Sequence, residues 1–260
     1  MSNARIMLEV RKVTKRYGAI TAVRDVSFTV LPGEVLGYLG PNGSGKSPTV
    51  KMLAGLMPPS LGTVLFDGRD IQDDLIGYKA QVGYVPEEAH VYTYLTAPEY
   101  LRLCGRLRGI PAATLDRKID EFLRILGLDT DRHATLASFS KGMRQKVLLS
   151  AALLHNPRVV ILDEPVSGLD VSTALVVRTI VKALAGDGRI IFYSSHELDT
   201  VEKISTRVMI LRSGQVVADD SAANLRKLMH LASLEDVFSQ LAVKDNVEAV
   251  AGALLQAVRL

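Results

Sequence analysis

The chain has 260 residues, 48% of them hydrophobic and 23% charged, so it can bury a substantial core as one large domain or as one domain with an appendage. Its 31 basic and 28 acidic side chains leave a formal charge of +3, which is too small and too scattered to indicate nucleic-acid binding. The lone Cys104 excludes an internal disulfide and suits a reducing compartment. The sequence shows no signal-peptide core and no apolar run near the roughly 18 residues that span a bilayer, so we expect a soluble chain without direct membrane insertion.

The predicted elements alternate between strands and helices. Apolar runs bounded by Gly and Pro predict short strands through residues 6–39, and the apolar spacing after Lys46 predicts a helix that ends before Pro58. Leucines at helical spacing then predict a mainly helical insertion at about 93–155. Because strands and helices alternate again afterwards, we expect an α/β fold with a parallel sheet. The remaining predicted elements are a strand with an Asp-Gly turn at 63–71, strands at 159–163, 189–195 and 207–218, helices at 172–185 and 197–203, and an amphipathic helical extension at 221–260.

The stretch GPNGSGKS, residues 40–47, matches the phosphate-binding pattern G-x-x-x-x-G-K-[ST] between a predicted buried strand and a predicted helix. Gly43 and Gly45 allow the backbone to wrap around a phosphate with its N–H groups pointing inward. Lys46 would reach the β- and γ-phosphates, and the Ser47 hydroxyl would ligate Mg²⁺. The alternative is an incidental glycine-rich turn before a helix. This alternative is disfavoured because both the residue spacing and the position between a strand and a helix fit a phosphate-binding loop.

A second stretch, VVILDEP at 159–165, delivers two carboxylates to the end of a predicted buried strand, where α/β sheets hold their ligands. Asp163 would hold Mg²⁺ through water, and Glu164 would orient or deprotonate the attacking water. Taken alone, residues 159–165 could also be a strand that ends in a solvated turn. This alternative becomes less favoured because the same chain contains the phosphate-binding pattern at residues 40–47.

Several further stretches resemble motifs of the nucleotide-binding subunits of ABC transporters. FSKGMRQK at 139–146 resembles the ABC signature LSGGQ, and SGLD at 167–170 resembles the D-loop. YSSHEL contains a histidine at the position of the switch histidine, KRYG contains the aromatic residue that stacks on adenine, and VGYVPEE at 82–88 matches the Q-loop region. The resemblance covers residues 6 to about 220, with the motifs in the family's order and spacing.

This resemblance implies a P-loop NTPase core, in which a mixed sheet is flanked by helices and joined by an antiparallel β-subdomain. The helical subdomain at about 93–155 would be inserted into an ATPase domain at 1–220, followed by a C-terminal helical extension at 221–260. It also implies an ATP-binding and ATP-hydrolysing subunit that powers a membrane transporter through head-to-tail dimerisation. The expected cofactors are ATP and Mg²⁺. The expected partners are a transmembrane permease and a second ATPase subunit, which place the chain in the cytoplasm, peripheral on the inner face of the membrane.

The resemblance assigns a role to individual residues. The signature serine and second glycine of the family contact the γ-phosphate held by the opposite subunit, and Ser140 and Gly142 inherit these roles. Other interpretations stay open: Ser140 as a helix N-cap, His196 as a packed polar residue, and Tyr17 as a half-buried strand tyrosine. The catalytic residues are Glu164, His196 and Glu87; the metal ligands are Ser47, Glu87 and Asp163; and the nucleotide-binding residues are Tyr17, Asn42, Gly43, Ser44, Gly45, Lys46, Ser47, Pro48, Ser140, Lys141, Gly142, Met143 and Asp170.

Departures from the family pattern indicate a subgroup. Glu87 stands where many members have Gln, and Lys141 and Met143 replace Gly and Gln of the signature. Together with SLEDVFSQL at 233–241, these features resemble the bacterial ABC-2-type group, whose members are mostly exporters. We hypothesise that the positive charge of Lys141 offsets the added negative charge of Glu87.

Two surfaces of the chain are expected to meet partners. Residues 88–98 would line a groove that receives a coupling helix of the permease, with Tyr92, Tyr94 and Leu95 exposed, although these side chains could equally cover the local core. The apolar stripes of the C-terminal extension predict core packing or dimer contacts. Its end, residues 247–260, is apolar enough to need a covering surface.

Pro48 stands where the family has a threonine whose N–H and hydroxyl bind the α-phosphate. Proline fits the first turn of a helix, so the fold should tolerate it, although it disfavours helical dihedrals at Ser47. The lost hydrogen bond predicts weaker ATP binding. This keeps open a nucleotide-binding regulatory module with little hydrolysis as an alternative to a transport ATPase. A second alternative, independent of Pro48, is a soluble ABC-type ATPase not coupled to transport.

Overall fold

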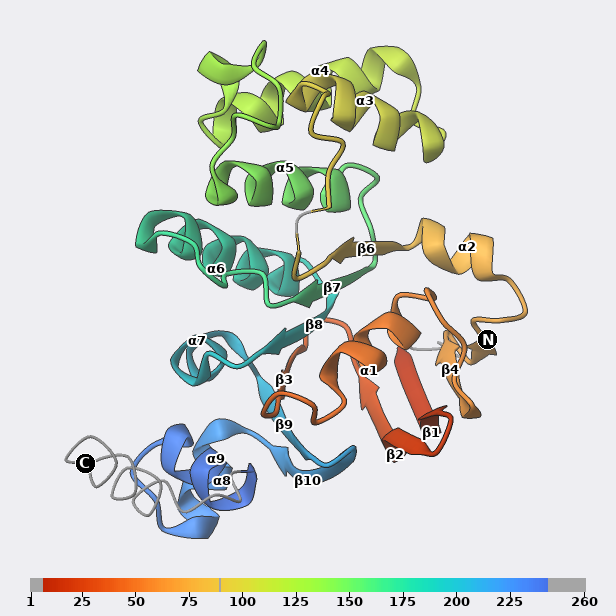
Figure 1. The fold of residues 1–260 in the computed structure, drawn as a ribbon, viewed down its shortest axis with the longest axis vertical. Coiled ribbons are helices and arrows are strands. Elements are labelled where there is room, and N and C mark those ends of the chain that lie inside the picture. Colours follow the sequence, from red (N-terminus) through yellow and green to blue (C-terminus); the bar gives the residue numbers. More distant parts are fainter. Residues whose placement is uncertain (1–6, 89, 243–260) are drawn as a thin grey trace, which may run out of the picture.

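The structure, a computed structural model, describes residues 7–88 and 90–242. Its centre is a six-stranded sheet with the strand order β10-β9-β3-β8-β7-β6 (Figure 1). All neighbouring strands are parallel except β10, which pairs antiparallel with β9. The sheet is therefore mixed, as predicted. Its strands are β3 (Val35–Leu39), β6 (Val82–Val85), β7 (Val159–Asp163), β8 (Ile190–Ser195), β9 (Arg207–Arg212) and β10 (Gln215–Asp220).

The prediction of one strand over 207–218 was wrong. The chain reverses at Ser213 and Gly214, which have φ of 51° and 80°, and this turn separates β9 from β10. Two consecutive positive φ values are typical of a tight hairpin turn. The apolar residues on both sides of the turn hide it in the sequence pattern.

A second, antiparallel sheet has the order β2-β1-β4-β5 and covers one face of the central sheet. Successive side chains of a strand point to opposite faces. Leu36 and Tyr38 of β3 accordingly join the core beneath the antiparallel sheet, and Val35 and Leu39 join the core on the other face. The strands of this sheet are β1 (Leu8–Tyr17), β2 (Ile20–Val30), β4 (Leu61–Phe66) and β5 (Arg69–Asp70), and the helices on the same side are α1 (Lys46–Leu53) and α2 (Leu75–Ala80).

The predicted insertion is helical. Its helices form a separate core around Leu101, Leu115 and Ile119, all fully buried. Thr96 and Glu99 form a reciprocal capping box that fixes where the first of these helices begins. The helices are α3 (Ala97–Leu107), α4 (Ala112–Ile125) and α5 (Lys141–Leu153), with a short 3₁₀ turn η1 (Asp129–Asp131) between the last two.

The second face of the central sheet is covered by helices, including those of the C-terminal extension. Leu225, Leu234 and Val237 are buried in the same core as the strand residues of that face. Most residues of the predicted apolar stripes therefore pack within this chain, although Leu228 is 71% exposed. The division into domains at residue 220 stays a prediction. The apolar segment 247–260 lies outside the described residues. The helices on this face are α6 (Val171–Gly186), α7 (Leu198–Ile204), α8 (Ala222–Met229) and α9 (Leu234–Ala242).

Candidate nucleotide site

The loop between β3 and α1 has the backbone of a phosphate-binding loop. Gly43 and Gly45 have φ of 77° and 106°, a region that favours glycine. A Cβ at Gly45 would lie 2.5 Å from the carbonyl oxygen of Ala22, so a larger residue would also clash. The turn after β9 supports the loop, because Gly214 N donates to the carbonyl oxygen of Ser44 at 2.9 Å. Ser44 itself is buried, and its Oγ has no hydrogen-bond partner among the described residues.

Helix α1 begins at Lys46 and points its N-terminus into this loop. Its first backbone bond that spans four residues runs from Thr49 N to Gly45 O, 3.2 Å. The N–H groups before Thr49 therefore have no partner within the helix, and they are available to an anion. Pro48 costs the helix no bond at this position, as predicted. Ser47 nevertheless keeps a helical backbone, in spite of the preference that proline imposes on the preceding residue.

The ammonium of Lys46 is buried in the loop. Its Nζ donates to the carbonyl oxygens of Gly40, at 2.5 Å, and Pro41, at 3.4 Å. Burial lowers the pKa of Lys46, and the nearby carboxylates of Glu164 and Asp163 oppose that change. A phosphate group would replace the two carbonyl oxygens with a stronger, charge-assisted partner.

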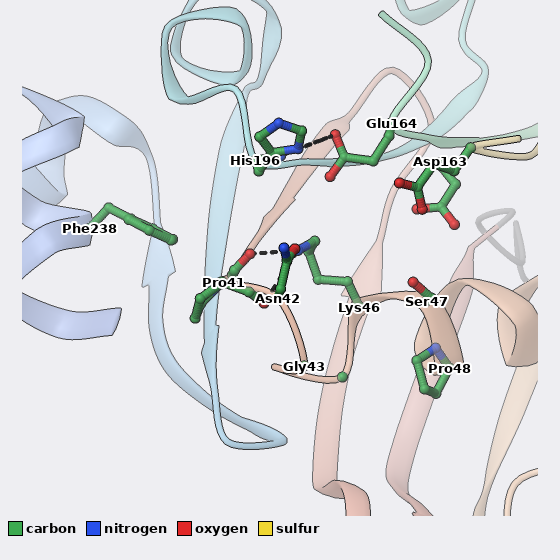
Figure 2. A pocket seen from close by; sticks show the side chains of 13 residues that line it. Pro41, Asn42, Gly43, Lys46, Ser47, Pro48, Asp163, Glu164, His196 and Phe238 are labelled. Carbon is green, nitrogen blue, oxygen red and sulfur yellow. Dashed lines mark hydrogen bonds and ion pairs between the residues drawn. The ribbon is translucent and has the colours of Figure 1, made fainter. Parts of the chain in front are cut away.

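Two carboxylates lie across the cavity from the loop. Figure 2 shows the Ser47 hydroxyl pointing from α1 toward Asp163, and Glu87 lines the same cavity. Burial, together with the smaller effect of the neighbouring Glu87 and Glu164 charges, raises the pKa of Asp163 to about 6, and the nearby Lys46 ammonium opposes this change. One hydroxyl and two carboxylates fit Mg²⁺, which takes oxygen ligands and keeps several positions for water and phosphate. In residues 7–88 and 90–242, no group of three or more His, Cys, Asp or Glu is arranged to hold a metal ion by itself.

Glu164 is held against His196. Its Oε2 lies 2.8 Å from His196 Nδ1 and accepts hydrogen bonds from His196 N and Ser195 Oγ, each at 3.2 Å. The backbone of Glu164 is in the left-handed region, with φ of 47°. Such strain in a non-glycine residue is typical of functional sites. The strand ends of β7 and β8 thus place a carboxylate and an imidazole above the loop (Figure 2).

Most of the predicted site residues lie together. One cavity of about 420 Å³ contains the loop, the carboxylates and the histidine. The predicted residues that line it are Asn42, Gly43, Gly45, Lys46, Ser47, Pro48, Glu87, Asp163, Glu164 and His196.

The signature residues do not line this cavity. Ser140 caps α5 by accepting a hydrogen bond from Met143 N at 3.2 Å, and Asp170 caps α6 by accepting from Thr173 N at 2.9 Å. A Cβ at Gly142 would lie 3.3 Å from Asp170 Oδ2, so the two motifs are neighbours. Lys141 is exposed beside them. Figure 1 shows α5 on the opposite side of β6 and β7 from α1, so a single chain keeps the signature away from its own loop.

Tyr17 also lies outside the cavity. Its ring is 47% exposed, and its hydroxyl is 3.4 Å from Met57 Sδ. Lys15 Nζ lies 5.6 Å from the ring centroid. A planar base could reach the exposed side of this ring, and its stacking on adenine stays a prediction.

The segment 88–98 agrees with the prediction only in part. Tyr92 and Tyr94 are 53% and 72% exposed, but Leu95 is half-buried, because Leu136 N and Ala137 N donate to the carbonyl oxygens of Leu95 and Thr93 and draw this segment inward. A groove of about 350 Å³ lies nearby between α3, α5 and β6. Of the described residues of this segment, His90 lines the groove, together with Pro86, Tyr100, Cys104 and Leu107.

Three residues of the cavity were not among the predicted site residues: Gly40 and Pro41, which belong to the predicted loop, and Phe238. Phe238, in α9, lines it beside the loop (Figure 2). The apolar periodicity of 233–241 predicted packing there, and no local signal distinguishes Phe238 from the residues that face the core.

The comparisons with known proteins agree with this geometry. The family model "ABC transporter" matches residues 23–167, more than half of the chain. The ABC transporter ATP-binding protein NatA of Bacillus subtilis is 32% identical over 90% of this chain and 96% of its own length. The linearmycin resistance ATP-binding protein LnrL of the same organism is 34% identical over 84% of this chain and 70% of its own length.

Solved structures show the same relationship. An ATP binding subunit of an ABC transporter superposes with a TM-score of 0.84 at 34% identity, over 90% of this chain and 99% of that one. A dimeric bacterial ABC transporter cassette shares the fold, with a TM-score of 0.76 at 24% identity over 82% of this chain and 98% of that one. In the part of the chain that the structure describes, none of the helices has the length and apolarity to cross a membrane. The chain belongs to the ATP-binding subunits of the ABC transporter family.

Proposed function

We propose that the chain hydrolyses ATP to power a membrane transporter. The observation that carries this proposal is the single cavity in which Lys46, Ser47, Asp163, Glu164 and His196 meet. Phosphoryl transfer needs little covalent chemistry from a protein and depends on positioned charges, and this cavity provides them.

Each residue has a defined task in this proposal. Lys46 exchanges its carbonyl partners for the β- and γ-phosphate oxygens. Ser47, Asp163 and Glu87 would hold Mg²⁺, which would neutralise the negative charge of the phosphates. Glu164 orients and deprotonates the attacking water, and His196 contacts the γ-phosphate. Because Glu164 is bonded to His196 in this structure, its carboxylate has to turn from the imidazole toward the water before the reaction.

A second copy of the chain would complete the site. The neighbouring caps of α5 and α6 place Ser140, Lys141, Gly142 and Asp170 on one exposed edge, away from this chain's own loop. In a head-to-tail dimer, this edge would face the γ-phosphate on the partner. The solved cassette of the same fold is described as dimeric.

The transporter partner would be a separate transmembrane permease, and the transport would be export. The relative named for linearmycin resistance supports the export of a compound. The groove lined by Pro86, Tyr100 and Leu107 provides an apolar surface for a short helix of the permease. The chain would then lie on the cytoplasmic face of the membrane, held there by its partner.

Pro48 favours a second, weaker candidate. A chain that lacks one hydrogen bond to the α-phosphate binds ATP less tightly, and a regulatory module would need binding but little turnover. The buried carboxylates favour hydrolysis over this alternative.

Two measurements test the proposed function. The purified chain should hydrolyse Mg-ATP, and it should be retained by the membrane protein encoded beside it when both are expressed together and extracted in detergent. Hydrolysis without retention would support a soluble ABC-type ATPase instead. Retention with saturable ATP binding but no hydrolysis would support the regulatory module.

A further inference from the structure

Helix α9 places an aromatic ring at the edge of the nucleotide cavity. Phe238 lines the cavity together with Pro41 and His196. Figure 2 shows the ring extending from the helix toward Pro41, on the side of the loop away from Ser47. The stretch SLEDVFSQL that contains Phe238 indicates a subgroup of the family in the sequence, and none of the residue roles assigned above includes this position.

The direction of the ring is fixed by how α9 begins and packs. Ser233 Oγ accepts a hydrogen bond from Asp236 N at 3.1 Å, and Ser233 N donates to Asp236 Oδ2 at 3.2 Å, so the first turn is capped reciprocally. Leu234 and Val237 are fully buried in the core beneath the helix. The next residue, Phe238, is turned about 100° around the helix from Val237 and therefore faces the cavity at the edge of the buried side.

The same helix contributes side chains to two cavities at the phosphate end of the site. Phe238 lines the nucleotide cavity together with Gly40 and Pro41, whose carbonyl oxygens hold Lys46 Nζ. One turn earlier, Glu235 lines a second cavity, which also contains His196. The helix thus lines the cavities that contain the ammonium and the imidazole that would meet the γ-phosphate.

We propose that Phe238 is a positioning residue of the ATPase site. Its ring forms an apolar wall that excludes water beside Lys46 and His196. Charges attract more strongly where water is excluded, so the wall strengthens the contacts made as the γ-phosphate is transferred. This inference rests on the proposed function, and it makes the C-terminal helix a part of the catalytic cavity.

The test compares two truncations in the same helix of the full-length chain. Phe238→Ala should lower kcat for Mg-ATP about tenfold, which corresponds to ~1.4 kcal/mol in the barrier. The Kd of Mg-ADP should change by less than about twofold, because ADP lacks the group that the wall surrounds. Phe238→Tyr keeps the ring and should retain kcat. Leu241→Ala removes an apolar side chain that packs against the core and does not line the cavity, so it should lower the Tm and leave kcat unchanged.

Three outcomes would overturn the proposal. These are an unchanged or raised kcat in Phe238→Ala, an equal loss of kcat in Leu241→Ala, and a parallel loss of ATP and ADP affinity that indicates a disturbed loop. An absence of hydrolysis by the unmodified chain would refute the proposed function and this inference with it. Hydrolysis by the unmodified chain with an unaffected Phe238→Ala variant would refute the inference alone.

Discussion

His196 Nδ1 lies 2.8 Å from Glu164 Oε2, and this contact joins the ends of two neighbouring parallel strands above the phosphate loop. Glu164 is buried, whereas the imidazole is more than half exposed. The carboxylate is thus held by a group that a nucleotide could contact directly. We infer that a γ-phosphate at His196 competes with Glu164 for the imidazole and releases the carboxylate toward the attacking water.

Glu164→Gln should lower ATP turnover about a hundredfold or more, because the amide cannot accept the proton of the attacking water. The Kd of ATP should stay the same or decrease, since one negative charge is removed beside the triphosphate. Turnover assays and isothermal titration calorimetry measure the two quantities. Asp187→Asn, an exposed acid at the far end of α6, is the control and should leave both unchanged. Full activity in Glu164→Gln would contradict the assigned role.

Replacing Pro48 should tighten ATP binding. Pro48→Ala restores the backbone N–H, and Pro48→Thr restores both the N–H and a hydroxyl. A charge-assisted hydrogen bond contributes about 1.5–3 kcal/mol, so the Kd of Pro48→Thr should be about ten- to a hundredfold lower, with Pro48→Ala between the two. The helix should remain, because the N–H at this position has no partner within α1. Equal ATP affinities in all three chains would show that position 48 does not contact the nucleotide.

Asp163→Asn should stabilise the nucleotide-free protein at neutral pH while it weakens the Mg²⁺ site. The pKa of Asp163 is raised to about 6 in the folded chain, so the folded state binds the proton more tightly than the unfolded state. Stability contributed by this group is therefore present at low pH and lost as the pH rises toward 6 and above. The charged carboxylate costs up to about 3 kcal/mol at pH 7.5, and this cost is removed in the variant.

Denaturant unfolding of both proteins between pH 5 and pH 8 measures this difference. The advantage of Asp163→Asn should grow with pH across this range and level off above the raised pKa of Asp163. The stabilisation of the unmodified chain by Mg-ATP should be larger than that of the variant, because the variant lacks a metal ligand. A stability difference that is constant from pH 5 to pH 8 would contradict the raised pKa.

Gly37→Ala should destabilise the fold behind the phosphate loop. A Cβ at Gly37 in β3 would lie 2.4 Å from Val201 Cγ1 and 2.5 Å from Ser205 Oγ, so α7 has to shift away from the sheet. Overpacking of this kind lowers the free energy of unfolding by about 1–3 kcal/mol. Gly186→Ala is the matched control, because nothing lies within 4 Å of its Cβ position. This control should be neutral or stabilise the end of α6 by about 0.5–1 kcal/mol, and thermal unfolding would measure both variants. Equal Tm values for the two variants would argue against the close approach of α7.

The sequence determined the local parts of this protein. The phosphate loop followed from GPNGSGKS because glycine spacing, a preceding apolar strand and a following helix are all encoded within a short stretch. The buried run VVILD likewise predicted β7 and the carboxylates at its end. The turn at Ser213–Gly214 escaped prediction because apolar residues on both sides hide it in the pattern. The half-buried Leu95 escaped prediction because it depends on hydrogen bonds from Leu136 and Ala137, some forty residues away in the sequence.

Only the tertiary structure decided how these parts meet. Glu164 and His196 are 32 positions apart, and their hydrogen bond exists because β7 and β8 are neighbours in the sheet. Phe238 enters the cavity because a capped helix packs across β9 at one particular rotation, and a change of one residue in that rotation would bury the ring in the core. Periodicity shows that a face is buried, but the identity of the surface that covers it depends on contacts between segments far apart in the chain.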